Sequence, residues 1–160
     1  MKAPIYLDNA ATTPLAPAVL AAMQAQLENS YANPASTHAL GREAADAVAQ
    51  ARAAVANLIG AVPQEIVWTS GATEANNLAI KGVADFYFRQ QRKPGHMITA
   101  RTEHKAVIDP MRDLESRGWR ITWLDVDTQG CIDTDLLAQA CAEDTALISV
   151  MHVNNEIGVV

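Results

Sequence analysis

The sequence has 160 residues, of which 49% are hydrophobic, and its 18 acidic side chains outnumber 12 Lys and Arg to give a formal net charge of -6. This charge argues against nucleic acid as the main partner, because phosphate binding needs clustered basic residues. No apolar run approaches the roughly 20 residues that span a bilayer, and the first ten residues lack the apolar core of a signal peptide. With only two cysteines, the composition predicts a soluble cytoplasmic protein that binds neither membrane nor nucleic acid.

The amino-terminal part predicts an extended arm followed by two helices. Residues 1–15 alternate short apolar and polar runs and form the arm. Pro17 can open a helix that continues to about Asn29, and a second, Ala-rich helix ends at Gly60. Apolar residues at three- and four-residue steps predict one buried stripe on this second helix. The stripe consists of Ala44, Val48, Ala51, Val55, Leu58 and Ile59.

Short apolar runs alternate with amphipathic stretches in the remainder of the chain. The runs predict strands at 66–68, 97–100, 121–126 and 146–153. The stretches predict helices at 73–90, 104–117 and 133–142, the last of them capped by Asp133. This order is typical of an α/β fold, a mostly parallel sheet with helices on both faces. Pro110 either kinks its helix or begins a second one after Asp109, and the sequence does not decide between them.

Polar residues follow three of the predicted strands, where an open parallel sheet binds its ligands. In Thr69-Ser-Gly-Ala-Thr-Glu74, the hydroxyls of Ser70 and Thr73 lie beside the free amides of a helix start. This arrangement suits a phosphate monoester, although an ordinary capped helix start would look the same. The segment is not a P-loop, because no Gly-Lys-Ser/Thr follows.

The other two polar segments contain His104 and a pair of asparagines, Asn154 and Asn155. A His at a strand end can stack on a planar ligand, although a single His is more often structural. Asn side chains are poor strand formers and can donate hydrogen bonds to a ligand oxygen. Three lysines that could be reactive, Lys81, Lys93 and Lys105, fall on helices or helix ends, and we expect them to face solvent. Nothing in the sequence predicts a metal site.

Five segments together resemble the pyridoxal-phosphate-dependent cysteine desulfurases of the class-V aminotransferase group. They occur in the family's order and cover the whole chain, and the closest likeness is to the housekeeping desulfurases of bacterial iron–sulfur cluster assembly. The matching segments are Tyr6–Pro14, Asn33–His38, Thr69–Glu74, Thr102–Val107 and His152–Val160.

The resemblance implies a role for each candidate residue. The cofactor would be pyridoxal 5'-phosphate, with its phosphate held by Ala72 and Thr73. His104 would stack over the pyridine ring and act catalytically in proton transfer. Asn155 would lie beside the ring's phenolic oxygen and the substrate carboxylate. The resemblance implies no metal.

The resemblance also implies a fold and an activity. The fold would be the large domain of a fold-type I transferase, represented by residues 16–160, with the arm at 1–15 packing on a small domain. The activity would be removal of sulfur from L-cysteine as an enzyme persulfide, giving L-alanine. Partners would be a second copy in a homodimer, an iron–sulfur scaffold and other sulfur acceptors.

Three parts that this chemistry needs have no counterpart among the 160 residues: the Schiff-base Lys, the Asp on the ring nitrogen and the persulfide Cys. We therefore expect the chain to be the amino-terminal portion of a longer protein, and to be inactive by itself. Two alternatives remain at this point. One is another class-V enzyme such as a selenocysteine lyase, and the other is an inactive module that oligomerises or binds phosphate.

Overall fold

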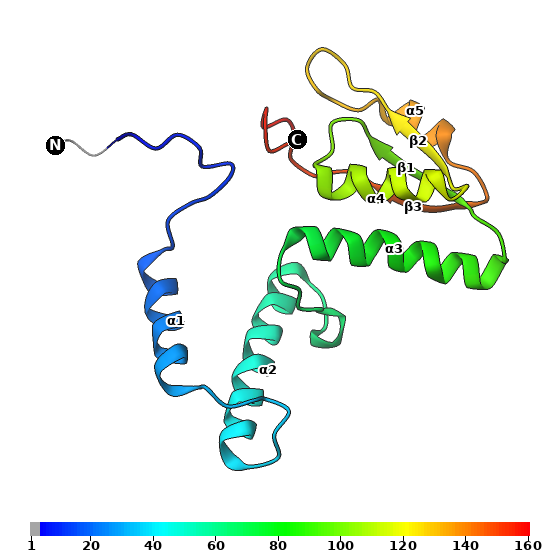
Figure 1. The fold of residues 1–160 in the computed structure, drawn as a ribbon. Coiled ribbons are helices and arrows are strands. Elements are labelled where there is room, and N and C mark those ends of the chain that lie inside the picture. The colour runs from blue at the N-terminus through cyan, green and yellow to red at the C-terminus, as the bar shows by residue number, and fades with distance from the viewer. Residues whose placement is uncertain (1–3) are drawn as a thin grey trace. The chain divides into compact units, whose positions relative to one another are not determined.

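A computed structural model describes residues 4–160, which form two compact units divided between Trp68 and Thr69 (Figure 1). The first unit comprises the described residues up to Trp68, and the second comprises Thr69–Val160. No helix among residues 4–160 is long and apolar enough to cross a membrane. Each unit is described by itself below.

The first unit contains two helices with the ends that the sequence predicts. Helix α1, Pro17–Asn29, begins with Pro17, whose fixed φ suits the first helical turn. Helix α2, Ala39–Ile59, begins after His38, whose Nδ1 accepts a hydrogen bond of 3.2 Å from the Gly41 amide. It ends at Gly60, where φ is 69°. A residue in the left-handed conformation stops a helix, and glycine adopts this conformation without strain. Gly60 itself therefore determines where α2 ends.

The buried stripe predicted on α2 is wrong over most of its length. Of its six residues only Ala44 is buried, whereas Val48, Val55, Leu58 and Ile59 are exposed. Helical spacing shows which residues share a face, but burial also needs another element against that face. Within the described part of the first unit, α2 packs on the 3₁₀ turn Pro63–Glu65, which leaves most of the stripe uncovered.

The predicted strand at 66–68 is also wrong, because this segment forms no strand. A strand needs a neighbouring strand to take up its backbone hydrogen bonds. Here the carbonyl oxygen of Ile66 instead accepts a hydrogen bond from Nη1 of Arg52, and the same guanidinium lies 5.6 Å from the centre of the Trp68 ring.

The predicted arm, residues 1–15, begins in residues 1–3, which lie outside the described residues. From residue 4 to Ala16 the chain forms no helix or strand and contains one turn at 9–11. The hydroxyl of Tyr6 donates to the carbonyl oxygen of Asp8 at 2.8 Å. The arm is therefore held locally by a turn and side-chain hydrogen bonds.

The second unit alternates helices and strands, as predicted. Its three strands form one parallel sheet in the order β2-β1-β3, so the first strand in sequence lies in the middle. Its elements are α3 (Ala72–Gln91), β1 (His96–Ala100), α4 (Lys105–Ser116), β2 (Arg120–Leu124), α5 (Thr134–Ala140) and β3 (Thr145–Ser149). Asp133 caps α5, as predicted, by accepting from the amides of Asp135 and Leu136. Pro110 lies inside a single helix, which settles the alternative left open by the sequence.

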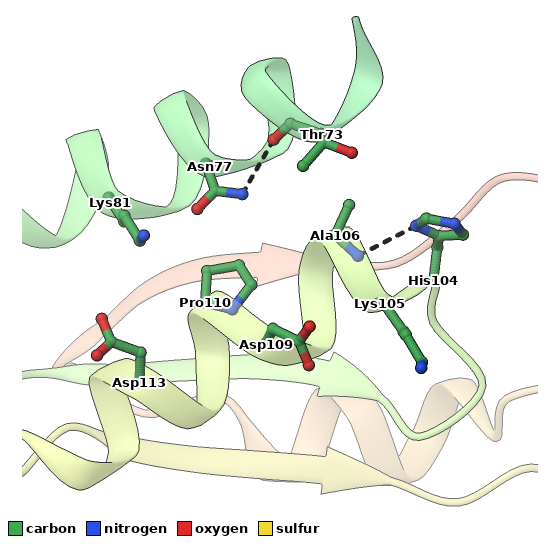
Figure 2. Close-up of a pocket in the computed structure, with 9 residues that line it drawn as sticks. All are labelled: Thr73, Asn77, Lys81, His104, Lys105, Ala106, Asp109, Pro110 and Asp113. Carbon is green, nitrogen blue, oxygen red and sulfur yellow. Dashed lines mark hydrogen bonds between the residues drawn. The ribbon is translucent and has the colours of Figure 1, made fainter.

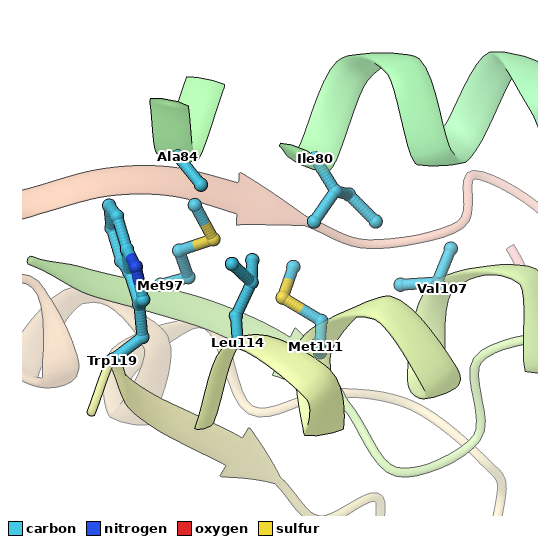
Figure 3. Packing of buried hydrophobic residues seen from close by; sticks show 7 residues of the cluster. All are labelled: Ile80, Ala84, Met97, Val107, Met111, Leu114 and Trp119. Carbon is cyan, nitrogen blue, oxygen red and sulfur yellow. The ribbon is translucent and has the colours of Figure 1, made fainter. Parts of the chain in front are cut away.

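The main core lies between one face of the sheet and helices α3 and α4 (Figure 3). Met97 of β1 meets apolar side chains that recur at three- and four-residue steps along α4. The ring of Trp119 packs edge-on against Tyr87, with centroids 5.6 Å apart. The buried cluster consists of Ile80, Ala84, Met97, Val107, Met111, Leu114 and Trp119.

The opposite face of the sheet carries the alternate residues of β1, because successive side chains of a strand point to opposite faces. Ile98 is fully buried there and pairs in register with Ile148 of β3. Ala100 and Ile148 line one apolar cavity of about 310 Å³ together with Leu137 of α5. Helices therefore cover both faces, as the sequence predicts.

Two strands are shorter than predicted, and the reason is visible for β3. It ends at Ser149 rather than 153, because the amide of Met151 donates to the carboxylate of Glu103 instead of a neighbouring strand. Strand β2 ends at Leu124, after which Val126 forms an isolated antiparallel bridge with Ile132.

Candidate functional site

A cavity of about 400 Å³ lies in the groove between α3 and α4 (Figure 2). Thr73, from the first turn of α3, and His104, immediately before α4, lie at the same end of this groove. The structure therefore places two of the predicted ligand-binding residues on one cavity. The groove is lined by Thr73, Asn77, Lys81, His104, Lys105, Ala106, Asp109, Pro110 and Asp113.

The start of α3 offers hydrogen-bond donors to an anion. Its N-cap residue, Gly71, has no side chain to cap the helix, so the first amides of this 20-residue helix face outward. The helix dipole adds partial positive charge at the same point. Ala72 is the first helical residue, and Thr73 adds an exposed hydroxyl.

Ser70 does not contribute a donor to this end, contrary to the expectation from the sequence. Its amide and hydroxyl both donate to Oε2 of Glu74, at 2.7 and 2.5 Å. These hydrogen bonds hold the pKa of Glu74 below its ordinary value, the side-chain bond from Ser70 being the largest cause. An anion at this helix start is therefore left with the donors of Ala72 and Thr73.

His104 is fixed by its role as the cap of α4. Its Nδ1 accepts a hydrogen bond of 3.1 Å from the amide of Ala106. A neutral imidazole whose Nδ1 accepts must carry its proton on Nε2. Because the side chain is exposed and lines the groove, it presents a ring face and an N–H donor to a ligand there.

The donors at the start of α3 and the ring of His104 fit a planar ligand that carries a phosphate. Backbone amides at a helix start bind phosphate without any basic side chain. An imidazole held at one edge leaves a face free for stacking. The residues present are therefore compatible with the cofactor that the resemblance implies.

The fourth predicted residue, Asn155, does not line this groove. It is exposed on the segment after β3, where its Nδ2 donates to Oε1 of Glu156 at 3.1 Å. The neighbouring Asn154 is buried, with 8% of its surface exposed, and lines the apolar cavity beneath the other face of the sheet. The structure thus keeps Thr73 and His104 together and Asn155 on a separate segment.

Two buried polar residues lie beside the site in positions that the sequence does not predict: the sequence assigns Glu103 no role, and Asn154 is expected to donate to a ligand. Glu103 and Asn154 are 8% exposed and directly precede His104 and Asn155. Burial is the main cause that raises the pKa of Glu103, against the lowering effects of the Met151 amide and of His104. The signal that could have found them is their position: each follows a buried strand and precedes a candidate ligand residue.

The rest of the groove carries both signs of charge. Lys81 and Lys105 are exposed, as the sequence predicts, and line the groove together with Asp109 and Asp113. Within residues 4–160, no group of three or more His, Cys, Asp or Glu side chains could hold a metal ion. The groove is therefore a mixed polar site whose phosphate-compatible end is the start of α3.

Comparison with known proteins places this architecture in a family. The model for aminotransferase class-V matches residues 5–160. A cysteine desulfurase of Neisseria meningitidis serogroup C is 55% identical over 161 residues, which is all of this chain and 39% of the relative. A cysteine desulfurase of Rattus norvegicus is 56% identical over 157 residues, covering 98% of this chain and 34% of the relative.

Solved structures agree with the sequence relatives. A structure titled NifS-like protein matches with a TM-score of 0.88 and 38% identity, over 94% of this chain and 40% of that one. A structure titled SspA in complex with cysteine matches with a TM-score of 0.85 and 43% identity, over 92% of this chain and 42% of that one. These neighbours confirm the predicted fold class, that of the fold-type I large domain.

The chain spans about 40% of the length of the curated relatives that it matches first. The match to the family model nevertheless runs through both units and includes the groove with Thr73 and His104. The resemblance inferred from the five sequence segments is confirmed at the level of the family: this chain belongs to the class-V aminotransferases.

Proposed function

We propose that this chain is the cofactor-binding portion of a pyridoxal-phosphate-dependent cysteine desulfurase, which takes sulfur from L-cysteine as an enzyme persulfide and leaves L-alanine. The family, the names of the relatives and the cysteine in one similar structure support this function. The observation that carries it is the groove in which Thr73 and His104 meet. This cofactor requires hydrogen-bond donors for its phosphate and a ring that stacks on its pyridine, and both lie at one end of this cavity.

Ala72 and Thr73 bind the phosphate in this proposal. Their amides point out of the start of α3, and the Thr73 hydroxyl adds a third donor. Hydrogen bonds to a dianion are charge-assisted and about twice as strong as neutral ones. The carboxylate of Glu74 does not compete for these donors, because its Oε2 accepts hydrogen bonds from the amide and hydroxyl of Ser70 instead.

His104 would stack on the pyridine ring and act in proton transfer. The cofactor, when bound, supplies an electron sink for the bonds that break at the substrate. Because Nδ1 accepts from the Ala106 amide, the neutral ring carries its proton on Nε2, and this N–H is the donor that it offers at the groove. Asn155, the fourth residue of the site, would donate from Nδ2 to the phenolic oxygen, and would have to give up its hydrogen bond to Glu156 to do so.

We propose further how the protein is organised, where it acts and which partners it serves. Residues 1–15 form an arm, and 16–160 form part of the large domain of a homodimer in the cytoplasm. The sulfur passes to an iron–sulfur scaffold and other acceptors. The relatives named cysteine desulfurase IscS support this setting.

A hybrid protein tests the function directly. In it, this chain replaces the matching segment of the N. meningitidis relative, so that the remaining parts of a complete enzyme are present. We expect the purified hybrid to bind pyridoxal phosphate, seen by its visible absorbance, and to release sulfide and alanine in equal amounts from L-cysteine with a reductant. A folded hybrid that binds the cofactor but converts no cysteine would contradict the function.

The substitution Thr73→Val in the hybrid tests the phosphate site. Valine has nearly the same size as threonine but lacks the hydroxyl donor. A hydrogen bond to a charged group contributes roughly 1.5–3 kcal/mol. We therefore expect cofactor affinity, measured by equilibrium titration, to fall about tenfold or more. Ser70→Ala is the matched control, because that hydroxyl is bonded to Glu74, and it should leave affinity nearly unchanged. Equal affinities for Thr73→Val and the unsubstituted hybrid would refute the assignment.

A further inference from the structure

We propose that Glu103 and Asn154 are positioning residues that together fasten the loop after β1 to the segment after β3, and so set the separation of His104 and Asn155. We call these two residues the clasp. The proposal rests on the proposed function for what His104 and Asn155 do, whereas the clasp itself is visible in the structure.

Glu103 makes one half of the clasp. Its Oε1 accepts a hydrogen bond from the amide of Met151, 48 residues further along the chain. That amide would otherwise continue the ladder of β3, so the carboxylate ends the strand and takes over its next hydrogen bond. Its own amide bonds to the carbonyl oxygen of Ala100 at 3.3 Å, which turns the chain directly after β1.

Asn154 makes the other half, in the reverse direction. Its Nδ2 donates to the carbonyl oxygen of Thr102 at 3.3 Å, so a side chain from the second segment reaches back to the first loop. Its Oδ1 accepts from the amides of Glu156 at 2.9 Å and Ile157 at 3.1 Å. One amide group therefore both shapes its own segment and ties it to the loop after β1.

The clasp acts on the two residues that follow it. His104 is bonded covalently to Glu103, and Asn155 to Asn154, so each candidate ligand residue is one peptide unit from a buried anchor. Exposed side chains on loops are mobile unless the backbone beneath them is held. Two buried residues that each reach across to the opposite loop hold both backbones at once.

The cost of burying Glu103 supports a specific role. A carboxylate with 8% of its surface exposed loses hydration, and burial raises its pKa. Such a group persists in a fold where its hydrogen bond is needed. A purely structural link between two loops could use a neutral side chain without this cost.

Amide hydrogen exchange on the 160-residue chain tests the clasp without cofactor. Glu103→Ala should speed exchange of the Met151 amide by about tenfold or more, because a hydrogen bond to a charged acceptor is lost. It should also speed exchange at Glu156 and Ile157, and Asn154→Ala should speed exchange at Met151, since the halves act together. Ile98, in the buried middle of β1, reports on the whole unit and should not change.

Conservative variants and a matched control sharpen this test. Glu103→Gln keeps an acceptor oxygen and should hold Met151 exchange within about threefold of the unsubstituted chain. Glu143→Ala removes an exposed carboxylate before β3 and should change none of these amides. The proposal is overturned if each variant affects only its own bonded amides, or if Ile98 accelerates as much as Met151.

The hybrid protein adds a functional readout. Glu103→Ala should lower kcat about tenfold and alter the circular dichroism of the bound cofactor, while KM changes less, and Glu103→Gln should restore most of the loss. Unchanged kcat in Glu103→Ala overturns the positioning role. A hybrid that binds no cofactor would instead count against the proposed function, and the exchange experiment would still decide the clasp.

Discussion

The two units of this chain bury their apolar side chains to very different extents. In the second unit, α3 and α4 enclose a continuous cluster against the sheet, with Met97 and Met111 fully buried. Among the described residues of the first unit, the buried hydrophobic residues are Ala44, Ala56 and Ile66, while Leu27 and Leu58 are largely exposed. The stability of this chain therefore comes mainly from the unit that also carries the candidate site.

The largest effect should come from a cavity in the second unit. Met111→Ala removes a fully buried side chain, and such truncations lower the free energy of unfolding by about 2–5 kcal/mol. The matched change in the first unit, Leu58→Ala, affects a side chain that is 84% exposed and should cost less than about 0.5 kcal/mol. Urea unfolding, monitored by hydrogen exchange of the amides in β1 and in α2, measures the stability of each unit separately. Similar losses of unfolding free energy in both variants would show that the two units contribute equally to stability.

A buried histidine should give the second unit a pH dependence of its own. The ring of His96 bridges all three strands, with Nδ1 2.8 Å from Oγ1 of Thr145 and Nε2 2.8 Å from Oγ1 of Thr122. Burial is the main cause that lowers its pKa from 6.5, with Arg120 adding to the effect and Asp144 opposing it.

The sign follows from proton binding in the two states. Below about pH 6.5 the unfolded chain takes up a proton on this ring that the folded unit resists, so stability falls as the pH drops from there toward the lower folded pKa. His96→Gln should flatten this part of the curve at a cost of about 1–3 kcal/mol at pH 7.5. An unchanged slope in His96→Gln would contradict the prediction.

The smallest effect should come from a tertiary contact of the first unit, that of Arg52 with Ile66 and Trp68. Arg52 donates to the carbonyl oxygen of Ile66 and lies over Trp68, and a cation–π contact near the surface contributes about 0.5–1 kcal/mol. Arg52→Gln should therefore shift the indole N–H resonance of Trp68 and loosen 66–68 locally. Arg42→Gln, on the same helix, should leave that resonance in place. Loss of structure throughout the second unit would show that the units depend on each other more than their cores suggest.

The features predicted correctly from sequence are those that neighbouring residues determine. Gly60 ends α2 through its own φ, and Asp133 caps α5 through amides two and three positions away. The alternation of helices and strands was visible for the same reason. Such signals need only the local chain.

The wrong predictions concern strands whose formation or length depends on residues far away in the sequence. The segment 66–68 needs a neighbouring strand to form a strand itself, and the end of β3 depends on Glu103, 48 residues before Met151. The site divides in the same way. The motif around Thr73 and the position of His104 after a strand could be read directly, whereas a buried Glu103 is contrary to what its residue type suggests.

The order of the strands has a consequence for how the protein is made. Strand β1 is the middle strand, yet His96 precedes its partner Thr145 by 49 residues. At a synthesis rate of about 5–20 residues per second, β1 leaves the ribosome roughly 2–10 s before β3. During that interval the edge of β1 that pairs with β3 has no partner, and an unpaired strand edge can pair with another chain. Slow codons between β2 and β3 would lengthen this exposure, so the timing of translation bears on the yield of folded protein.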